Sequence, residues 1–134
     1  MTGDRRKSVA LNLAFMLREA ARAHPEKPAV LSAGGALSYV ELDAASDRFA
    51  AGLTVRGLRP GDAVALQLPN VPQFVAAYFG ILKAGCVVVP VNVLFKATGV
   101  ARSLSAAAAG TGVTADPPSP GTTWPSARTT PPRR

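Results

Sequence analysis

The stretch between Gly57 and Asn92 constrains the fold of this chain more than any other part of the sequence. It opens with a turn signal at 59–62 (Arg-Pro-Gly-Asp), because proline presets one backbone angle and glycine accepts a positive φ. Ala63–Leu68 then alternates larger aliphatic residues with alanine and glutamine, which is the period of a half-buried strand. Pro69 ends that strand.

A helix and a second strand follow. Asn70 is a suitable N-cap, and Gln73 stands three residues later, which is the spacing of a capping box. Val71–Lys83 is apolar on nearly every side, as expected of a buried helix, and Gly85 can end it in the left-handed conformation. Cys86–Val91 is a continuous, valine-rich run that is typical of a strand covered on both faces. Two strands joined by one helix predict a right-handed parallel crossover.

Residues Val75–Phe95 could also be interpreted as a membrane span. A span needs about 20 predominantly apolar residues in a row. This run is interrupted by Lys83, Gly85, Pro90 and Asn92. We therefore expect no membrane span and prefer the buried helix and strand.

Two motifs give this chain a family resemblance. The first is Leu37–Leu42 (Leu-Ser-Tyr-Val-Glu-Leu), and the second is Leu82–Pro90 (Leu-Lys-Ala-Gly-Cys-Val-Val-Val-Pro). Together with the sequence between them, these motifs resemble the N-terminal region of the adenylate-forming, AMP-binding superfamily of acyl-CoA synthetases, adenylation domains and luciferases. The run from Pro69 to Gly85 is most similar to the acyl-CoA synthetase branch, which includes long-chain fatty acid–CoA ligases. The resemblance covers Leu11–Phe95.

The resemblance implies an acid–thiol ligase. Such enzymes activate a carboxylic acid with Mg-ATP, release pyrophosphate and then transfer the acyl group to CoA. In the family, the phosphate-binding loop, the ribose-binding aspartate and the lid lysine lie downstream of the part that resembles this chain. Lys83 and Lys96 do not match these positions, and Lys83 is most simply a cation at a helix end.

We accordingly predict no catalytic, cofactor-binding or metal-binding residue in this chain, and no binding of ATP, Mg²⁺ or CoA. The first functional hypothesis is a truncated acyl-CoA synthetase-like ligase that is inactive alone. Its partner would be the missing remainder of the ligase, or a second copy of the chain. The alternative is a non-catalytic interaction module, or half of a split ligase, that docks through the sheet edge formed by Cys86–Val91.

Upstream of this stretch, a helix is predicted between Asn12, a possible N-cap, and Pro25. Its buried face is expected at positions spaced three and four residues apart, namely Leu13, Met16, Leu17, Ala20 and His24. A signal peptide is also imitated by the basic residues 5–7, the run 9–17 and the sequence Ala-Arg-Ala at 21–23. Polar residues interrupt that apolar run, so the amphipathic helix is preferred.

A hairpin and a second helix come next. Ala29–Ser32 and Ala36–Leu37 flank the turn 33–35 (Ala-Gly-Gly), which lacks the lysine of a phosphate-binding P-loop. Ser38 and Glu41 have capping-box spacing, so Glu41 has a structural task rather than that of a general base. The helix that follows is expected to bury Leu42, Ala45, Phe49 and Leu53, to turn Asp43, Asp47 and Arg48 toward water, and to end at Gly57.

The charge and the cysteine content of the chain narrow the classes of protein that it could belong to. Fifteen Lys and Arg against eight Asp and Glu give a formal charge of +7. The excess lies at the two ends, and no basic face is interleaved with aromatic residues, so we expect no nucleic-acid binding. The single cysteine, Cys86, can form no intramolecular disulfide, which suits a cytoplasmic location. Cys86 and the lone His24 are expected to be an inert thiol and an ordinary helix-end residue, not a catalytic pair or a zinc site.

Beyond Lys96 the composition changes. Residues 101–134 hold one aromatic residue, Trp124, and six of the chain's twelve prolines fall between 117 and 132. Such a composition predicts disorder. Gly121–Pro125 echoes the family's phosphate loop only faintly, without its second glycine and its lysine. We hypothesise that this tail is an out-of-frame translation of GC-rich DNA, which the other two reading frames beyond codon 96 would test.

The predicted organisation is therefore a flexible N-terminus (1–10), a partial AMP-binding N-terminal subdomain (11–97) and a disordered tail outside the family (98–134). The fold class is α/β. It comprises a parallel βαβ crossover with a hairpin and flanking helices, as one part of the adenylate-forming enzyme fold.

Overall fold

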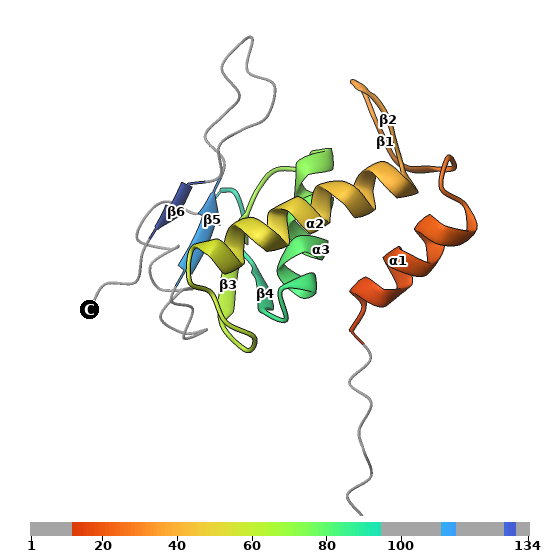
Figure 1. Cartoon of the computed structure of the whole chain (residues 1–134). Coiled ribbons are helices and arrows are strands. Elements are labelled where there is room, and N and C mark those ends of the chain that lie inside the picture. The colour runs from red at the N-terminus through yellow and green to blue at the C-terminus, as the bar shows by residue number, and fades with distance from the viewer. Residues whose placement is uncertain (1–11, 95–110, 115–127, 131–134) are drawn as a thin grey trace, which may run out of the picture.

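The computed structural model describes residues 12–94 and two further short strands (Figure 1). In chain order the elements are α1 (Ala14–Ala23), β1 (Pro28–Ser32), β2 (Gly35–Ser38), α2 (Tyr39–Val55), β3 (Ala63–Gln67), α3 (Pro72–Lys83), β4 (Val87–Pro90), β5 (Thr111–Thr114) and β6 (Arg128–Thr130). None of the helices in this described part is long and apolar enough to cross a membrane.

The predicted parallel crossover is confirmed. β3 and β4 pair in parallel from Ala63 opposite Val87 to Leu66 opposite Pro90, and α3 joins them. The amide of Val87 donates to the carbonyl of Asp62 (2.8 Å), just before β3 begins. Every second residue of β4, counted from Val87, therefore points its amide at β3. The backbone nitrogens of Val88 and Pro90 face the other way, toward the outer edge of the described sheet, which we call the free side of β4.

The sheet continues beyond β3 on its other edge. β5 pairs with β3 in parallel and β6 pairs with β5 antiparallel, which gives the strand order β4-β3-β5-β6. These two strands are what the structure describes within 98–134, and the predicted disorder of that range stays a prediction. The backbone of β3 is buried at its centre and needs hydrogen-bonding partners on both edges, and the threonines and valine of β5 favour an extended backbone.

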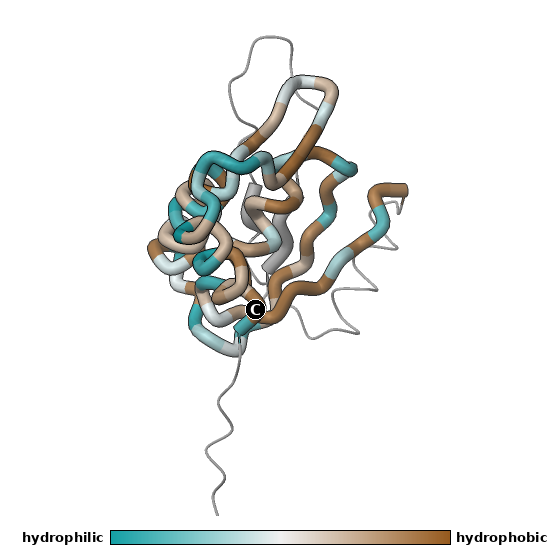
Figure 2. Tube along the Cα trace, turned by 90° about the vertical axis from the view of Figure 1, so that its right-hand side faces the viewer, coloured by the Kyte–Doolittle hydropathy of each residue, from teal (hydrophilic) through white to brown (hydrophobic). Residues whose placement is uncertain are grey.

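Two hydrophobic clusters hold the helices to the sheet. The first joins Val64 and Leu66 of β3 to Leu53 of α2, to Ile81 of α3 and to Cys86. The second joins α1, α2 and α3 through Leu17, Leu42, Ala45 and Ala76. Figure 2 shows the helices to one side of the strands, with hydrophobic residues concentrated along the strands. Since α3 contributes to both clusters, its nearly uniform apolar character follows from its position.

The α2–α3 crossing is close because of one glycine. A Cβ atom added at Gly80 of α3 would stand 2.7 Å from both Cβ and Cδ1 of Phe49 on α2. Real Cβ atoms do not approach other atoms so closely, so any larger residue at position 80 would force the two helices apart.

Glycine ends both central helices as predicted. After α2, the amide of Gly57 donates to Thr54 (3.0 Å) and that of Leu58 to Leu53 (3.2 Å), and Gly57 has φ +89°. This is a Schellman motif. Gly85, with φ +77°, ends α3 in the same way. At the start of α2 the predicted capping box is also confirmed. The Ser38 amide donates to Oε2 of Glu41 (2.8 Å), and the Glu41 amide donates to Oγ of Ser38 (3.3 Å).

The predicted capping of α3 by Asn70 is wrong. The N-cap residue is Val71, which makes no side-chain cap hydrogen bond and has an extended backbone (φ −126°, ψ 156°). Val71 precedes Pro72, and the proline ring excludes helical angles from the residue before it. The helix therefore cannot begin before Pro72, and Asn70 falls one position too early.

The buried face of α1 also differs from the prediction. Leu17 is buried as expected, but it is joined by Ala14 and Ala21, whereas 67% of Met16 and 46% of Leu13 are exposed. The helix begins at Ala14, and Oδ1 of Asn12 accepts a hydrogen bond from the Ala14 amide (2.9 Å). The small residues Ala14 and Ala21 allow α1 to approach the other helices, so the contact row shifts by one residue.

Candidate functional site

Lys83, at the end of α3, is the first residue to consider as a functional cation, and the structure shows its ammonium group bound to two aspartates of α2. Only 4% of its side chain is exposed. Its Nζ donates to the carboxylate of Asp43, to the carbonyl oxygen of Asp43 (3.0 Å) and to Oδ1 of Asp47 (2.8 Å). An ammonium group has three N–H donors, so these three acceptors leave none for a ligand. The prediction that Asp43 faces water is wrong, because pairing with Lys83 draws its carboxylate to 20% exposure.

The other candidate nucleophile and bases are poorly suited to catalysis. Cys86 is 5% exposed, and burial, with a smaller effect of the Asp62 carboxylate, raises the pKa of its thiol. A thiol that keeps its proton is a weak nucleophile. The Ser38 amide, together with the Ser38 hydroxyl, lowers the pKa of Glu41, so this carboxylate is a weak base. His24 is the exposed C-cap residue of α1 and is not hydrogen-bonded to Cys86 in the described structure.

The described residues contain no group of three His, Cys, Asp or Glu side chains that could hold a metal ion. With Lys83 fully engaged, residues 12–94 also lack a free buried lysine for a phosphate. The part of the chain that the structure describes therefore does not fit the Mg-ATP site that the family resemblance implies. Lys96 lies outside the described residues.

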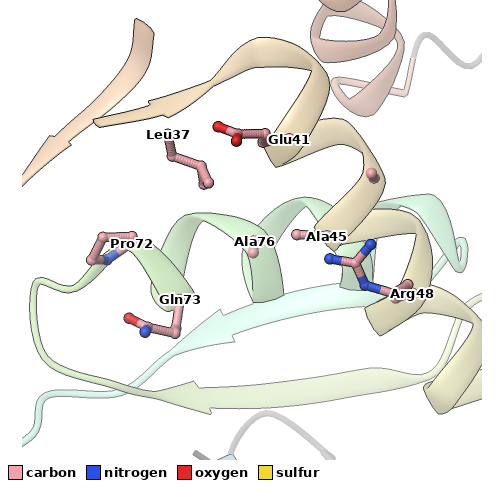
Figure 3. Close-up of a pocket in the computed structure, with 8 residues that line it drawn as sticks. Leu37, Glu41, Ala45, Arg48, Pro72, Gln73 and Ala76 are labelled. Carbon is pink, nitrogen blue, oxygen red and sulfur yellow. The ribbon is translucent and has the colours of Figure 1, made fainter. Parts of the chain in front are cut away.

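A pocket of about 410 Å³ lies between α2 and α3 (Figure 3). The two helices and the end of β2 supply its lining residues, which are Leu37, Glu41, Ala44, Ala45, Arg48, Pro72, Gln73 and Ala76. The pocket exists because small residues face each other here. Ala45 and Ala76 are both buried and form its floor, and neither is large enough to fill the space between the helices.

Charged groups stand at the two ends of this pocket. Glu41 and Arg48 are seven residues apart on α2, which places them on one face of the helix about two turns apart. Figure 3 shows the guanidinium of Arg48 beside Ala45, and Gln73 at the start of α3. The predicted solvent exposure of Arg48 is confirmed, but its position at the border of a pocket was not predicted.

The fold defines a class of protein: an α/β subdomain built around a parallel crossover. The sequence profile of the AMP-binding enzyme family matches residues 17–131. This chain belongs to the AMP-binding enzyme family. The match includes β5 and β6 and so reaches beyond Phe95, where the motifs alone place the end of the resemblance.

The relatives by sequence belong to several kinds of ligase. The chain is 49% identical over 77 residues to the salicyl-AMP ligase / salicyl-S-ArCP synthetase of Mycobacterium tuberculosis, covering 54% of this chain and 14% of that protein. It is 43% identical over 81 residues to a long-chain-fatty-acid–CoA ligase of Haemophilus influenzae, covering 60% of this chain and 14% of that one. The chain thus spans about one seventh of the length of these relatives.

Solved structures give the same result for the fold. The N-terminal domain of FACL13 from Mycobacterium tuberculosis superposes with a TM-score of 0.70 at 33% identity, over 74% of this chain and 26% of that one. The NpsA N-terminal subdomain of Klebsiella oxytoca superposes with a TM-score of 0.75 at 28% identity, over 84% of this chain and 30% of that one. The chain therefore matches about a quarter to a third of an N-terminal subdomain.

Proposed function

We propose that this chain is the amino-terminal scaffold of an adenylate-forming ligase and that it does not catalyse adenylation alone. The observation that supports this proposal is that the chain spans about one seventh of the length of its relatives, and that the buried lysine of its described part, Lys83, holds two helices together. The complete ligase would activate a carboxylic acid with ATP and transfer the acyl group to CoA. A fatty or aromatic acid is the proposed substrate class, in keeping with the names of the relatives. We also propose a cytoplasmic location.

Exchange of pyrophosphate into ATP tests this proposal. The purified 134-residue chain is incubated with ATP, Mg²⁺, labelled pyrophosphate and a panel of fatty and aromatic acids, beside a full-length long-chain-fatty-acid–CoA ligase as positive control. We expect exchange by the control only. Acid-dependent exchange by the chain, absent from a Lys83→Met preparation carried through the same purification, would refute the scaffold proposal.

The remainder of the ligase is the partner that we propose. Val87, Val93 and Leu94 are exposed on and just after β4, and Val87 lies on a strand whose sequence is apolar on both faces. Such residues would be covered by further chain in a complete subdomain. Co-expression with a polypeptide that carries the downstream family motifs should yield a complex and restore exchange.

Docking through the free edge of β4 is the alternative partner mode, and one feature disfavours it. Pro90 occupies one of the two amide positions on the free side of β4, and proline has no N–H to donate. An incoming strand would find a donor only at Val88, so we favour a partner that covers the apolar face.

A further inference from the structure

The pocket between α2 and α3 is lined mainly by apolar residues, and it is bordered by an arginine that the packing of the helices does not require. Arg48 is exposed, and its guanidinium has no hydrogen-bond or ion-pair partner within the described structure. Its neighbours in the lining are apolar or neutral, with Ala45 and Ala76 beneath and Gln73 across the pocket. A guanidinium offers five N–H donors in a planar fork, which matches the two oxygens of a carboxylate.

The neutral polar group of the lining lies apart from Arg48. Gln73 is half-buried in the first turn of α3, and Ala76 and Ala45 lie between it and Arg48 (Figure 3). A small ligand whose anionic group meets Arg48 would therefore extend over the two alanines toward Gln73.

The opposite end of the pocket limits how much negative charge a ligand can carry. Glu41 borders that end, and its carboxylate is held in the capping box by the Ser38 amide. It remains ionised at neutral pH, because this hydrogen bond lowers its pKa. A second negative group on a ligand would meet this carboxylate, so multiply charged anions such as phosphate esters are disfavoured.

We propose that this pocket binds a small organic monoanion, with its charged oxygens on Arg48 and a compact apolar body over Ala45 and Ala76. The volume of about 410 Å³ falls within the range of small-molecule pockets. The site uses residues of α2 and α3 and the end of β2, all within the described part of the chain. It is therefore independent of the proposed ligase reaction, and it survives if the chain shows no pyrophosphate exchange.

A titration with matched ligands tests the proposal. Amide spectra of the ¹⁵N-labelled full chain are recorded with 3-phenylpropionate, its neutral isostere 3-phenylpropanol and its cationic isostere 3-phenylpropylamine. We expect saturable shifts at the amides of Ala45, Gln73 and Ala76 with the carboxylate. The alcohol should bind at least about fivefold more weakly, because hydrogen bonds to charged groups exceed those to neutral ones.

Two arginine variants of the same helix complete the test. Arg48→Gln should weaken 3-phenylpropionate binding about five- to tenfold, while Arg56→Gln, at the C-cap of α2 and outside the pocket, should leave it unchanged. Both sites are exposed, so neither variant should unfold the chain. Equal binding of acid and alcohol, equal weakening by both variants, or shifts that spread over the surface without saturation would each overturn the proposal.

Discussion

Replacing Lys83 by methionine tests whether this residue is part of the framework. Methionine keeps most of the apolar stem of the side chain but removes the ammonium group, which leaves the carboxylates of Asp43 and Asp47 without their shared cation. Removing one partner of a fully buried ion pair costs about 3–5 kcal/mol. Asp43 retains 20% side-chain exposure and Asp47 retains 53%, so water partly solvates both. We therefore expect a loss of about 2–3 kcal/mol in the free energy of unfolding.

Urea denaturation followed by circular dichroism measures this loss, and a double-mutant cycle assigns it. Asp43→Asn alone should cost about 1–2 kcal/mol, because Lys83 keeps Asp47 and the Asp43 carbonyl as acceptors. The double variant should be less destabilised than the sum of the single ones by about 1–2 kcal/mol. The exposed control Asp47→Asn should cost less than about 1 kcal/mol. Strict additivity of Lys83→Met and Asp43→Asn would refute the reasoning.

Three further predictions concern packing, pH and reactivity. Gly80→Ala should destabilise the chain by about 1–2 kcal/mol in urea denaturation, because overpacking against Phe49 (about 1–3 kcal/mol) exceeds the gain in helix propensity (about 1 kcal/mol); a stabilised variant would contradict the 2.7 Å approach. The pKa of Glu41 is lowered in the folded chain, so its stabilisation is present at neutral pH and is lost as the pH falls through the acid range below the ordinary carboxyl value. Urea midpoints should show that Glu41→Gln lacks this component of acid sensitivity, and an unchanged pH profile would argue against the capping role. Because burial raises the pKa of Cys86, its thiol should react with an aromatic disulfide at pH 8 much more slowly in the folded chain than in urea; equal rates would show that the site is open.

The sequence predicted those elements whose causes are local. Ser38 and Glu41 have the spacing of a capping box, and nothing nearby competes with it, so the start of α2 was correct. Asn70 and Gln73 have the same spacing, but the angles that Pro72 imposes on Val71 take precedence. A spacing rule therefore holds only where the intervening residues can adopt the helical backbone.

Features that depend on distant partners were harder to predict. β5 carries little hydrophobic signal of its own, and it becomes a strand by pairing with β3, more than forty residues earlier in the chain. The pocket was missed for a related reason. It is a gap between alanines on two helices, and only their juxtaposition reveals that Arg48 borders an unfilled space. Ala44, Ala45 and Ala76 are the signal that could have suggested it.

The position of Pro90 has a consequence for how this chain behaves at high concentration. Fibrils of the cross-β type grow when identical strands stack and every amide finds a carbonyl in the next molecule. On the free side of β4, Val88 can donate a hydrogen bond to such a ladder, but Pro90, the next residue on that side, has no N–H. The ladder would therefore break after one donor. Molecules that meet along this strand are therefore denied a template for ordered stacking, even though the strand is among the most valine-rich segments of the chain.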